Sequence, residues 1–171
     1  MGFILESKGI NNGIISPEYG KCSNNMIDGI PQTSIPLNWY GYPNNTKSFA
    51  IVFIDNDNYQ EQGVCWLHWS VANIPKEINE LEENCSINIK DINEKIIQGK
   101  NSWMCELPKE SEVCNRYGGP AAMEFNHEYE FIIYALDTFL PLEDGYYQNN
   151  FLKAIKGHIL AETTLTGKYI I

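Results

Sequence analysis

Polar side chains with acid–base chemistry lie inside three apolar segments of the chain. His68 is in the middle of "CWLHWSV", His127 and Tyr129 belong to "HEYEFIIYALD", and Asp55 closes "SFAIVFID". Imidazole, phenol and carboxylate groups exchange hydrogen bonds, and an imidazole also changes charge near neutral pH. If the three segments converge, these groups predict a small polar pocket.

Three predicted β-strands would position these groups. The segments 48–55, 64–74 and 127–137 are rich in β-branched and aromatic residues, which favour strands. Because side chains alternate between the two faces of a strand, the second segment would place Trp66, His68 and Ser70 on one face and Leu67, Trp69 and Val71 on the other. Each strand would therefore set a polar group among aromatic or aliphatic neighbours.

Plainer explanations fit the same residues. A histidine in a strand is often a hydrogen-bonded core residue, and we assign His158 in "KGHILAE" to that class. Asp55 and Asp57, with Asn56 and Asn58, could instead form a solvated turn at the end of a strand. His68 and His127 fit either interpretation, a hydrogen-bonded core or a binding pocket.

Two catalytic roles are alternatives to binding. A cluster of His and Asp could hold a metal ion, but the chain has no Cys-x-x-Cys pair, and we predict neither a metal nor a cofactor. A hydrolase using Asp55 and the histidines is the second alternative. The sequence has no Gly-x-Ser-x-Gly nucleophile elbow, and we predict no catalytic residues and no enzyme.

Net charge limits the partners. The 171 residues carry a formal charge of −10 and no cluster of Lys and Arg, which argues against nucleic acid and anionic membrane surfaces. No apolar run reaches the ~18 residues of a spanning helix, so we expect no membrane insertion. The start, "MGFILESKG", lacks the basic region and cleavage site of a signal peptide. We therefore expect a cytoplasmic protein whose five scattered cysteines are reduced.

The rest of the chain predicts the fold class. We expect loops at 38–47 and 58–63, a helical turn at 76–84, and a short helix running into a strand at 148–162. The stretch 101–124 is irregular, and irregular stretches of this length are usually functional or disordered. Strands joined by loops predict an all-β fold, a two-sheet antiparallel β-sandwich with a few short helices, in one domain over residues 1–171.

The chemistry of the predicted pocket favours an anion. A histidine and Tyr129 can donate hydrogen bonds, and the pair Gly118–Gly119 would let backbone amides approach a ligand closely. Asp55 would hold a histidine in one tautomer or accept a hydrogen bond from a protonated ligand oxygen. A phosphate beside this carboxylate is repelled unless a proton is shared between them.

The order of the motifs resembles the phosphatidylethanolamine-binding protein family, also called Raf-kinase-inhibitor-like, in its bacterial and archaeal branch. "TSIPLNW" and "PNNTKSFAIVFIDND" resemble the family's Ser-Pro-x-Leu-x-Trp, Pro-x-x-Thr-x-Ser and Asp-Pro-Asp blocks, and "WLHWSVANIP" resembles its Trp-x-His-Trp strand. "YGGPAAMEFNHEYEFIIYALD" is similar to its Gly-Pro-x-Pro-Pro and His-x-Tyr-x-Phe segment, and "GHILAETTLTGKY" to its C-terminus. The resemblance covers about residues 13–169.

The resemblance implies a two-sheet antiparallel β-sandwich with a pocket for phosphate-like anions. It places two sets of residues there: Asp55, His68, His127 and Tyr129 would line the pocket, with Asp57, Trp66, Gly119 and Pro120 at its rim. We predict a non-enzymatic, regulatory binding module for a small phosphate, carboxylate or phospholipid-headgroup-like anion. The family also implies an alternative, an inhibitor that acts through its surface on a serine protease or kinase, and it allows a homodimer.

The chain departs from the family pattern at the pocket entrance. Asn56 and Tyr59 replace the two prolines of the Asp-Pro-Asp-Ala-Pro block, and Ala121 and Ala122 replace a Pro-Pro pair. Proline fixes φ near −65° and stiffens a loop. We therefore expect a reshaped or more mobile entrance.

Overall fold

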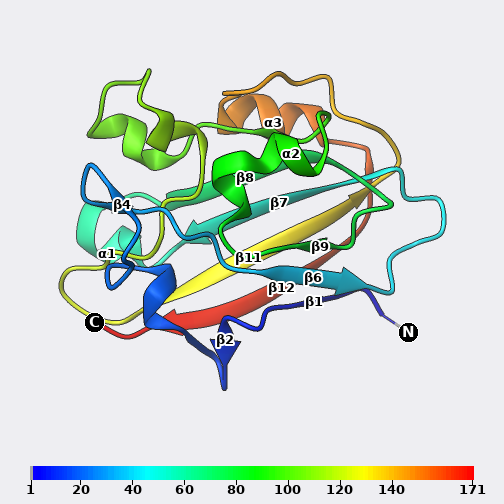
Figure 1. Cartoon of the computed structure of the whole chain (residues 1–171). Helices are drawn as coiled ribbons and strands as arrows, with labels where there is room; N and C mark the ends of the chain where they lie inside the picture. The colour runs from blue at the N-terminus through cyan, green and yellow to red at the C-terminus, as the bar shows by residue number, and fades with distance from the viewer. Residues whose placement is uncertain (1) are drawn as a thin grey trace.

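The strands of the protein form three sheets (Figure 1). A computed structural model describes residues 2–171. The largest sheet has seven strands in the order β10 (Ile97–Gln98), β8 (Trp66–Pro75), β7 (Ser48–Asp55), β11 (His127–Leu136), β12 (Ile159–Tyr169), β3 (Ile14–Ile15) and β2 (Ile10–Asn11). The second has the order β1 (Ile4–Glu6), β6 (Leu37–Tyr40) and β9 (Glu80–Leu81), and the third pairs β4 (Met26–Ile27) with β5 (Ile30–Pro31).

Short helices join the strands. The α-helices are α1 (Asn58–Gln62), α2 (Ile89–Ile92) and α3 (Gln148–Ala154). Four 3-10 helices are η1 (Pro17–Tyr19), η2 (Cys85–Asn88), η3 (Ser102–Cys105) and η4 (Glu112–Asn115). None of the helices in the described part of the chain has the length and apolar character needed to cross a bilayer.

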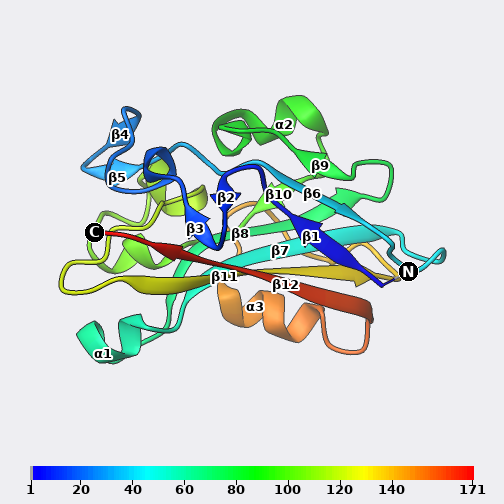
Figure 2. The ribbon, with the colours of Figure 1, turned by 90° about the horizontal axis from the view of Figure 1, so that it is seen from below.

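Two apolar cores cover the two faces of the large sheet. Phe49, Phe53 and Phe131 from the large sheet share one buried cluster with Trp39 of β6 and Leu81 of β9. On the opposite face, a second cluster joins the sheet to α3, with Ala50, Val52, Leu136, Phe151 and Ile155 among its members. Figure 2 shows this arrangement, with α3 below the large sheet and β1 and β6 above it.

The three central strands were predicted closely. The segments predicted at 48–55, 64–74 and 127–137 are β7, β8 and β11, with bounds that differ by no more than two residues. The prediction of a mostly β fold with a few short helices is confirmed. The sheets are not purely antiparallel, because Lys168 of β12 pairs in parallel with Ile14 of β3, and there are three sheets instead of the two predicted.

Several local predictions were wrong. The helical turn predicted at 76–84 contains β9, whose Leu81 pairs with Leu37 of β6. The loop predicted at 58–63 contains α1, and the loop predicted at 38–47 begins inside β6. These elements are short, so tertiary packing decides their conformation more than local propensity does.

A register shift also changes the faces predicted for β8. Phe53 pairs with Trp69, but the next residue, Ile54, pairs with Leu67, so His68 is an extra residue between the two pairs. A bulge of this kind re-aims side chains and interrupts their alternation. Ser70 consequently lies on the α3 side of the sheet, where its hydroxyl is 2.8 Å from the Tyr146 hydroxyl. The prediction that Ser70 shares a face with His68 was therefore wrong.

Candidate functional site

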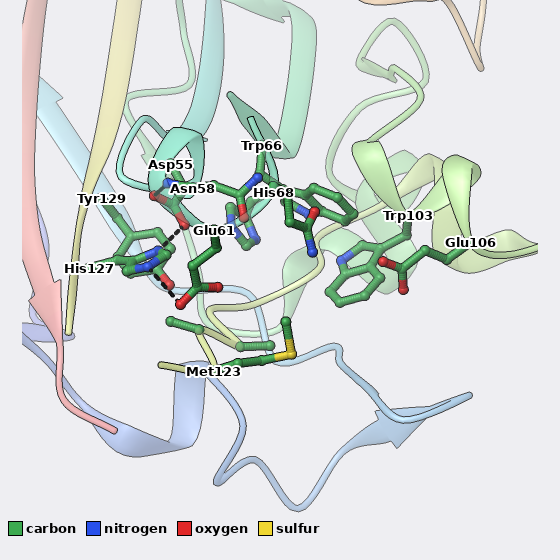
Figure 3. Close-up of a pocket in the computed structure, with 13 residues that line it drawn as sticks. Asp55, Asn58, Glu61, Trp66, His68, Trp103, Glu106, Met123, His127 and Tyr129 are labelled. Atoms are coloured by element: carbon green, nitrogen blue, oxygen red, sulfur yellow. Dashed lines mark hydrogen bonds and ion pairs between the residues drawn. The ribbon is translucent and has the colours of Figure 1, made fainter. Parts of the chain in front are cut away.

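A pocket of about 100 Å³ lies at one end of the large sheet, beside α1 (Figure 3). Met123 and Glu106, both exposed, stand at its mouth. A volume this small suits a single small group, since pockets for drug-sized ligands are several times larger. Its lining residues are Asp55, Asn58, Glu61, Gln62, Trp66, His68, Trp103, Glu106, Ala121, Ala122, Met123, His127 and Tyr129.

Strand register brings the polar residues of the pocket together. Asp55, the last residue of β7, pairs with Tyr129 of β11 on one side and with Trp66 of β8 on the other. The three residues form a row across three strands. His127 lies two positions before Tyr129, and His68 lies two positions after Trp66. The structure thus gathers all four residues expected to line the pocket, and Trp66 with them.

Asp55 fixes the orientation of His127. The Nδ1 atom of His127 lies 2.7 Å from Asp55 Oδ2, and both side chains are almost fully buried. Because a carboxylate only accepts hydrogen bonds, Nδ1 is the donor and Nε2 points toward the pocket. The second Asp55 oxygen, Oδ1, accepts a hydrogen bond of 3.1 Å from the backbone N–H of Asn58. One carboxylate therefore ties β7 to both β11 and α1.

His68 presents a hydrogen-bond acceptor to the pocket. Its Nδ1 lies 2.6 Å from the carbonyl oxygen of Gly118, which only accepts, so Nδ1 carries the proton. Burial lowers the pKa of His68 to about 4, and the ring is neutral at pH 7. Its Nε2 then bears a lone pair, and this buried atom has no hydrogen-bond partner within residues 2–171.

Three further buried groups offer donors. The Tyr129 hydroxyl and the indole Nε1 atoms of Trp66 and Trp103 are buried without a hydrogen-bond partner in the described part of the chain. Burial, reinforced by the charge of Asp55, raises the pKa of Tyr129 well above its ordinary value, so the phenol keeps its proton. The Trp66 ring is fixed by an edge contact with Trp103, with 5.1 Å between ring centroids.

A third acidic residue, Glu61 of α1, also reaches the pocket. Its side chain is only 4% exposed, and Oε1 lies 3.2 Å from His127 Nε2 (Figure 3). The same oxygen accepts a hydrogen bond of 2.9 Å from the backbone N–H of Glu124. The approach to His127 Nε2 is an ion-pair contact by distance and not a hydrogen bond, because Nε2 is buried without a hydrogen-bond partner within residues 2–171.

The remaining residues expected at the rim lie elsewhere. Asp57, Gly119 and Pro120 are absent from the pocket lining. Asp57 precedes α1 and accepts a hydrogen bond of 2.8 Å from the backbone N–H of Glu128. The Gly119 N–H donates to Pro31, and a Cβ on Gly119 would lie 2.1 Å from the Tyr19 carbonyl oxygen. Because it has no side chain, Gly119 thus allows two backbone segments to approach each other closely.

The expected amide cradle at the glycine pair was wrong. The Gly118 N–H donates to the His68 carbonyl oxygen at 3.0 Å, and the Gly119 N–H donates to Pro31 at 2.9 Å. Neither amide is free for a ligand. Gly118 contributes through its carbonyl oxygen instead, because that oxygen sets the tautomer of His68.

Sequence reasoning missed Glu61, Trp103 and Glu106 as pocket residues. Glu61 was assigned to a loop and the other two to an irregular stretch, so no periodicity indicated where their side chains point. One signal was present for Glu61. The absence of proline at position 59 leaves the Tyr59 N–H free to donate to Asn56 at 3.2 Å, which helps α1 to form.

The comparisons with known proteins identify the family. Residues 6–170 match the family model described as "Phosphatidylethanolamine-binding protein". The chain belongs to this family. It is 35% identical over 158 residues to the uncharacterized protein YxkA of Bacillus subtilis, covering 90% of this chain and 92% of YxkA. It is 36% identical over 136 residues to a UPF0098 protein of Methanothermobacter thermautotrophicus, covering 80% and 82% of the two chains.

Solved structures of family members have the same fold. A homolog from Chlamydia trachomatis superimposes with a TM-score of 0.77 at 29% identity, covering 99% of this chain and 98% of that one. YbcL of Escherichia coli gives a TM-score of 0.80 at 23% identity, covering 100% and 99%, a likeness that concerns the fold alone. The phosphatidylethanolamine-binding protein fold is therefore shown for this chain.

Proposed function

We propose that the protein is a non-enzymatic binding module that takes one small phosphate-like group in the pocket. The observation that carries this proposal is the set of unpartnered buried atoms around one cavity, within residues 2–171: His68 Nε2, His127 Nε2, the Tyr129 hydroxyl, Trp66 Nε1 and Trp103 Nε1. Leaving a buried polar atom unpartnered costs about 1–3 kcal/mol. A ligand that meets several of these atoms at once recovers part of this free energy.

The donors and acceptors fit a phosphate that still carries a proton. Tyr129 and Trp66 donate, so the ligand must offer acceptor oxygens there. Neutral His68 accepts through Nε2, so the ligand must also offer a donor. A phosphate that keeps at least one proton has both, whereas sulfate at neutral pH has only acceptors. Sulfate would leave His68 Nε2 unpaired, so the pocket should bind phosphate in preference to sulfate.

The charges around the pocket favour the same form of the ligand. Asp55, Glu61 and Glu106 line the pocket, and no Lys or Arg does so among the described residues. A fully ionised anion would be repelled by these carboxylates, while a protonated, singly charged one is repelled less. We therefore expect weak binding that strengthens as the ligand takes up a proton.

The family name supports the same chemistry and suggests two sources of ligand. Phosphatidylethanolamine carries a phosphate in its headgroup, but this phosphate is a diester without an O–H. Its ammonium group would then be the donor to His68. Free phosphate or a phosphate monoester would use its own O–H. The shared requirement is a phosphate group together with one donor.

A titration followed by NMR tests the proposal. Inorganic phosphate, glycerophosphoethanolamine and sulfate would each be added near pH ~6, where inorganic phosphate keeps at least one proton and sulfate keeps none. We expect the ring signals of His68 to shift with phosphate or with the headgroup and not with sulfate. The variant Tyr129→Phe removes one donor without changing the ring and should weaken binding about fivefold to tenfold. An unmoved His68 ring with all three ligands would refute the proposal.

The two alternatives have no specific observation in their favour. The pocket lining contains no Ser, Thr or Cys to serve as a nucleophile. Within residues 2–171, no group of three or more His, Cys, Asp and Glu side chains is arranged to hold a metal ion. Inhibition of a protease or kinase, a homodimer and a cytoplasmic location stay predictions from the sequence.

A further inference from the structure

We infer that Glu61 is a built-in competitor for the pocket, whose carboxylate occupies the position in which an external anion would meet His127 Nε2. This inference rests on the proposed function and adds a determinant of affinity to it. A carboxylate and a phosphate present the same kind of acceptor oxygen to an imidazole. The two therefore compete for the same face of His127.

The contacts of Glu61 are those of a bound ligand. Its side chain is 4% exposed although it belongs to a surface helix. One oxygen, Oε1, contacts His127 Nε2 at 3.2 Å and the backbone N–H of Glu124 at 2.9 Å. Glu61 thus links α1 to the loop on the other side of the pocket, and Figure 3 shows its carboxylate inside the cavity beside His127.

Helix α1 is fastened so that Glu61 points inward. At its start, Asn58 donates its backbone N–H to Asp55 Oδ1, and its side-chain Nδ2 donates to Val64 at 2.9 Å. At its end, Gly63 takes a left-handed conformation with φ 76°. Tyr59, on the outer side of the same helix, is 59% exposed. The helix therefore directs one carboxylate into the pocket while its aromatic residue faces solvent.

Glu61 fills only part of the site. His127 already has Asp55 on its Nδ1 side, and Glu61 adds a second carboxylate on its Nε2 side. His68 Nε2 and the Tyr129 hydroxyl remain without partners in the part of the chain that the structure describes. A phosphate that binds to these two atoms meets the Glu61 charge, so it must displace the carboxylate.

Removing the Glu61 charge tests the inference. The phosphate affinities of the wild type, Glu61→Gln and Glu61→Ala would be compared, with Glu106→Gln as the matched control. Glu106 lines the same pocket and loses the same charge, but it is exposed at the mouth and forms no ion pair within residues 2–171. We expect inorganic phosphate to bind about tenfold or more tightly to both Glu61 variants and less than about threefold more tightly to Glu106→Gln.

The outcomes separate the inference from the proposed function. If the wild type binds phosphate and the Glu61 variants bind it no more tightly than Glu106→Gln does, the competitor role is wrong and the binding module stands. If none of the four proteins binds phosphate, both are wrong. A second measurement needs only the wild type: phosphate that displaces Glu61 must shift the Glu124 amide signal, and an unmoved signal in the phosphate-bound protein overturns the inference.

Discussion

His127 Nδ1 and Asp55 Oδ2 lie 2.7 Å apart, although 72 residues separate them in the sequence. The contact joins the first residue of β11 to the last residue of β7, where the two strands run antiparallel. It also leaves His127 Nε2 aimed at the cavity. The geometry of the pocket therefore depends on this buried pair.

Replacing Asp55 should destabilise the fold markedly. Asp55→Asn keeps the size of the side chain but removes the charge and turns one of its two acceptors into a donor. Because both acceptors are used, we expect the free energy of unfolding to fall by about 2–4 kcal/mol in urea denaturation. Asp57→Asn is the matched control, since Asp57 accepts one hydrogen bond at the more open start of α1. A loss at Asp57 equal to that at Asp55 would contradict this account.

His68 should remain neutral far below the pH at which a histidine usually takes up a proton. Burial lowers its pKa from 6.5 to about 4, so its ring signals should titrate near the lower value in NMR. Between these two pH values the unfolded chain binds a proton that the folded chain excludes. The contribution of His68 to the free energy of unfolding is thus fully present above pH 6.5. It falls by about 3 kcal/mol as the pH drops through 4.

The variant His68→Gln isolates this contribution from that of the carboxylates. Gln does not titrate, so the stability of the variant should depend less steeply on pH between 4 and 6.5 than that of the wild type. Identical slopes, or a His68 ring that titrates near 6.5, would show that the ring is not held in a neutral, buried state.

Gly119→Ala should disturb the pocket although Gly119 does not line it. A Cβ at this position would lie 2.1 Å from the Tyr19 carbonyl oxygen, and a backbone atom cannot yield as a flexible side chain does. We expect the free energy of unfolding to fall by about 1–3 kcal/mol. The NMR signals of the His68 ring should also change, because the carbonyl of the neighbouring Gly118 accepts a hydrogen bond from that ring. Gly2→Ala, where a Cβ meets nothing within 4 Å, should be neutral. Equal stability of the two variants would exclude the close approach at Gly119.

The cysteines should differ in reactivity. Within residues 2–171 all five are free, and Cys22 and Cys105 are exposed. Burial raises the pKa of Cys85 to about 11, so little thiolate forms there near neutral pH. Alkylation of the native protein followed by mass spectrometry should label Cys22 and Cys105 first. Labelling of Cys85 at a similar rate would mean that its surroundings open readily.

The sequence was sufficient to find the centre of the site. Asp55, His68, His127 and Tyr129 could be selected because a polar side chain in a strong strand pattern is unusual and strands align such residues in rows. The bulge at His68 was not foreseeable, since an extra residue is defined only by the partner strand. The alternation rule therefore failed at Ser70, which lies outside the pocket on the α3 side of the sheet.

The orientation of residues outside the long strands could not be predicted from the sequence pattern. Glu61 lies in a helix of five residues, too short for a periodic signal, and its inward orientation depends on contacts with Asp55 and Glu124. Gly119 was selected for the right reason, a close approach of backbone, but its neighbour is Tyr19 instead of a ligand. At the position of the missing prolines the structure has helix α1, and the reshaped or more mobile entrance stays a prediction.

A crystal structure of the protein grown with millimolar phosphate tests the central claim most directly. The account predicts a tetrahedral anion in the pocket, within hydrogen-bond distance of His68 Nε2 and the Tyr129 hydroxyl. A pocket that holds only water under those conditions, or phosphate bound solely at other places on the surface, would contradict it.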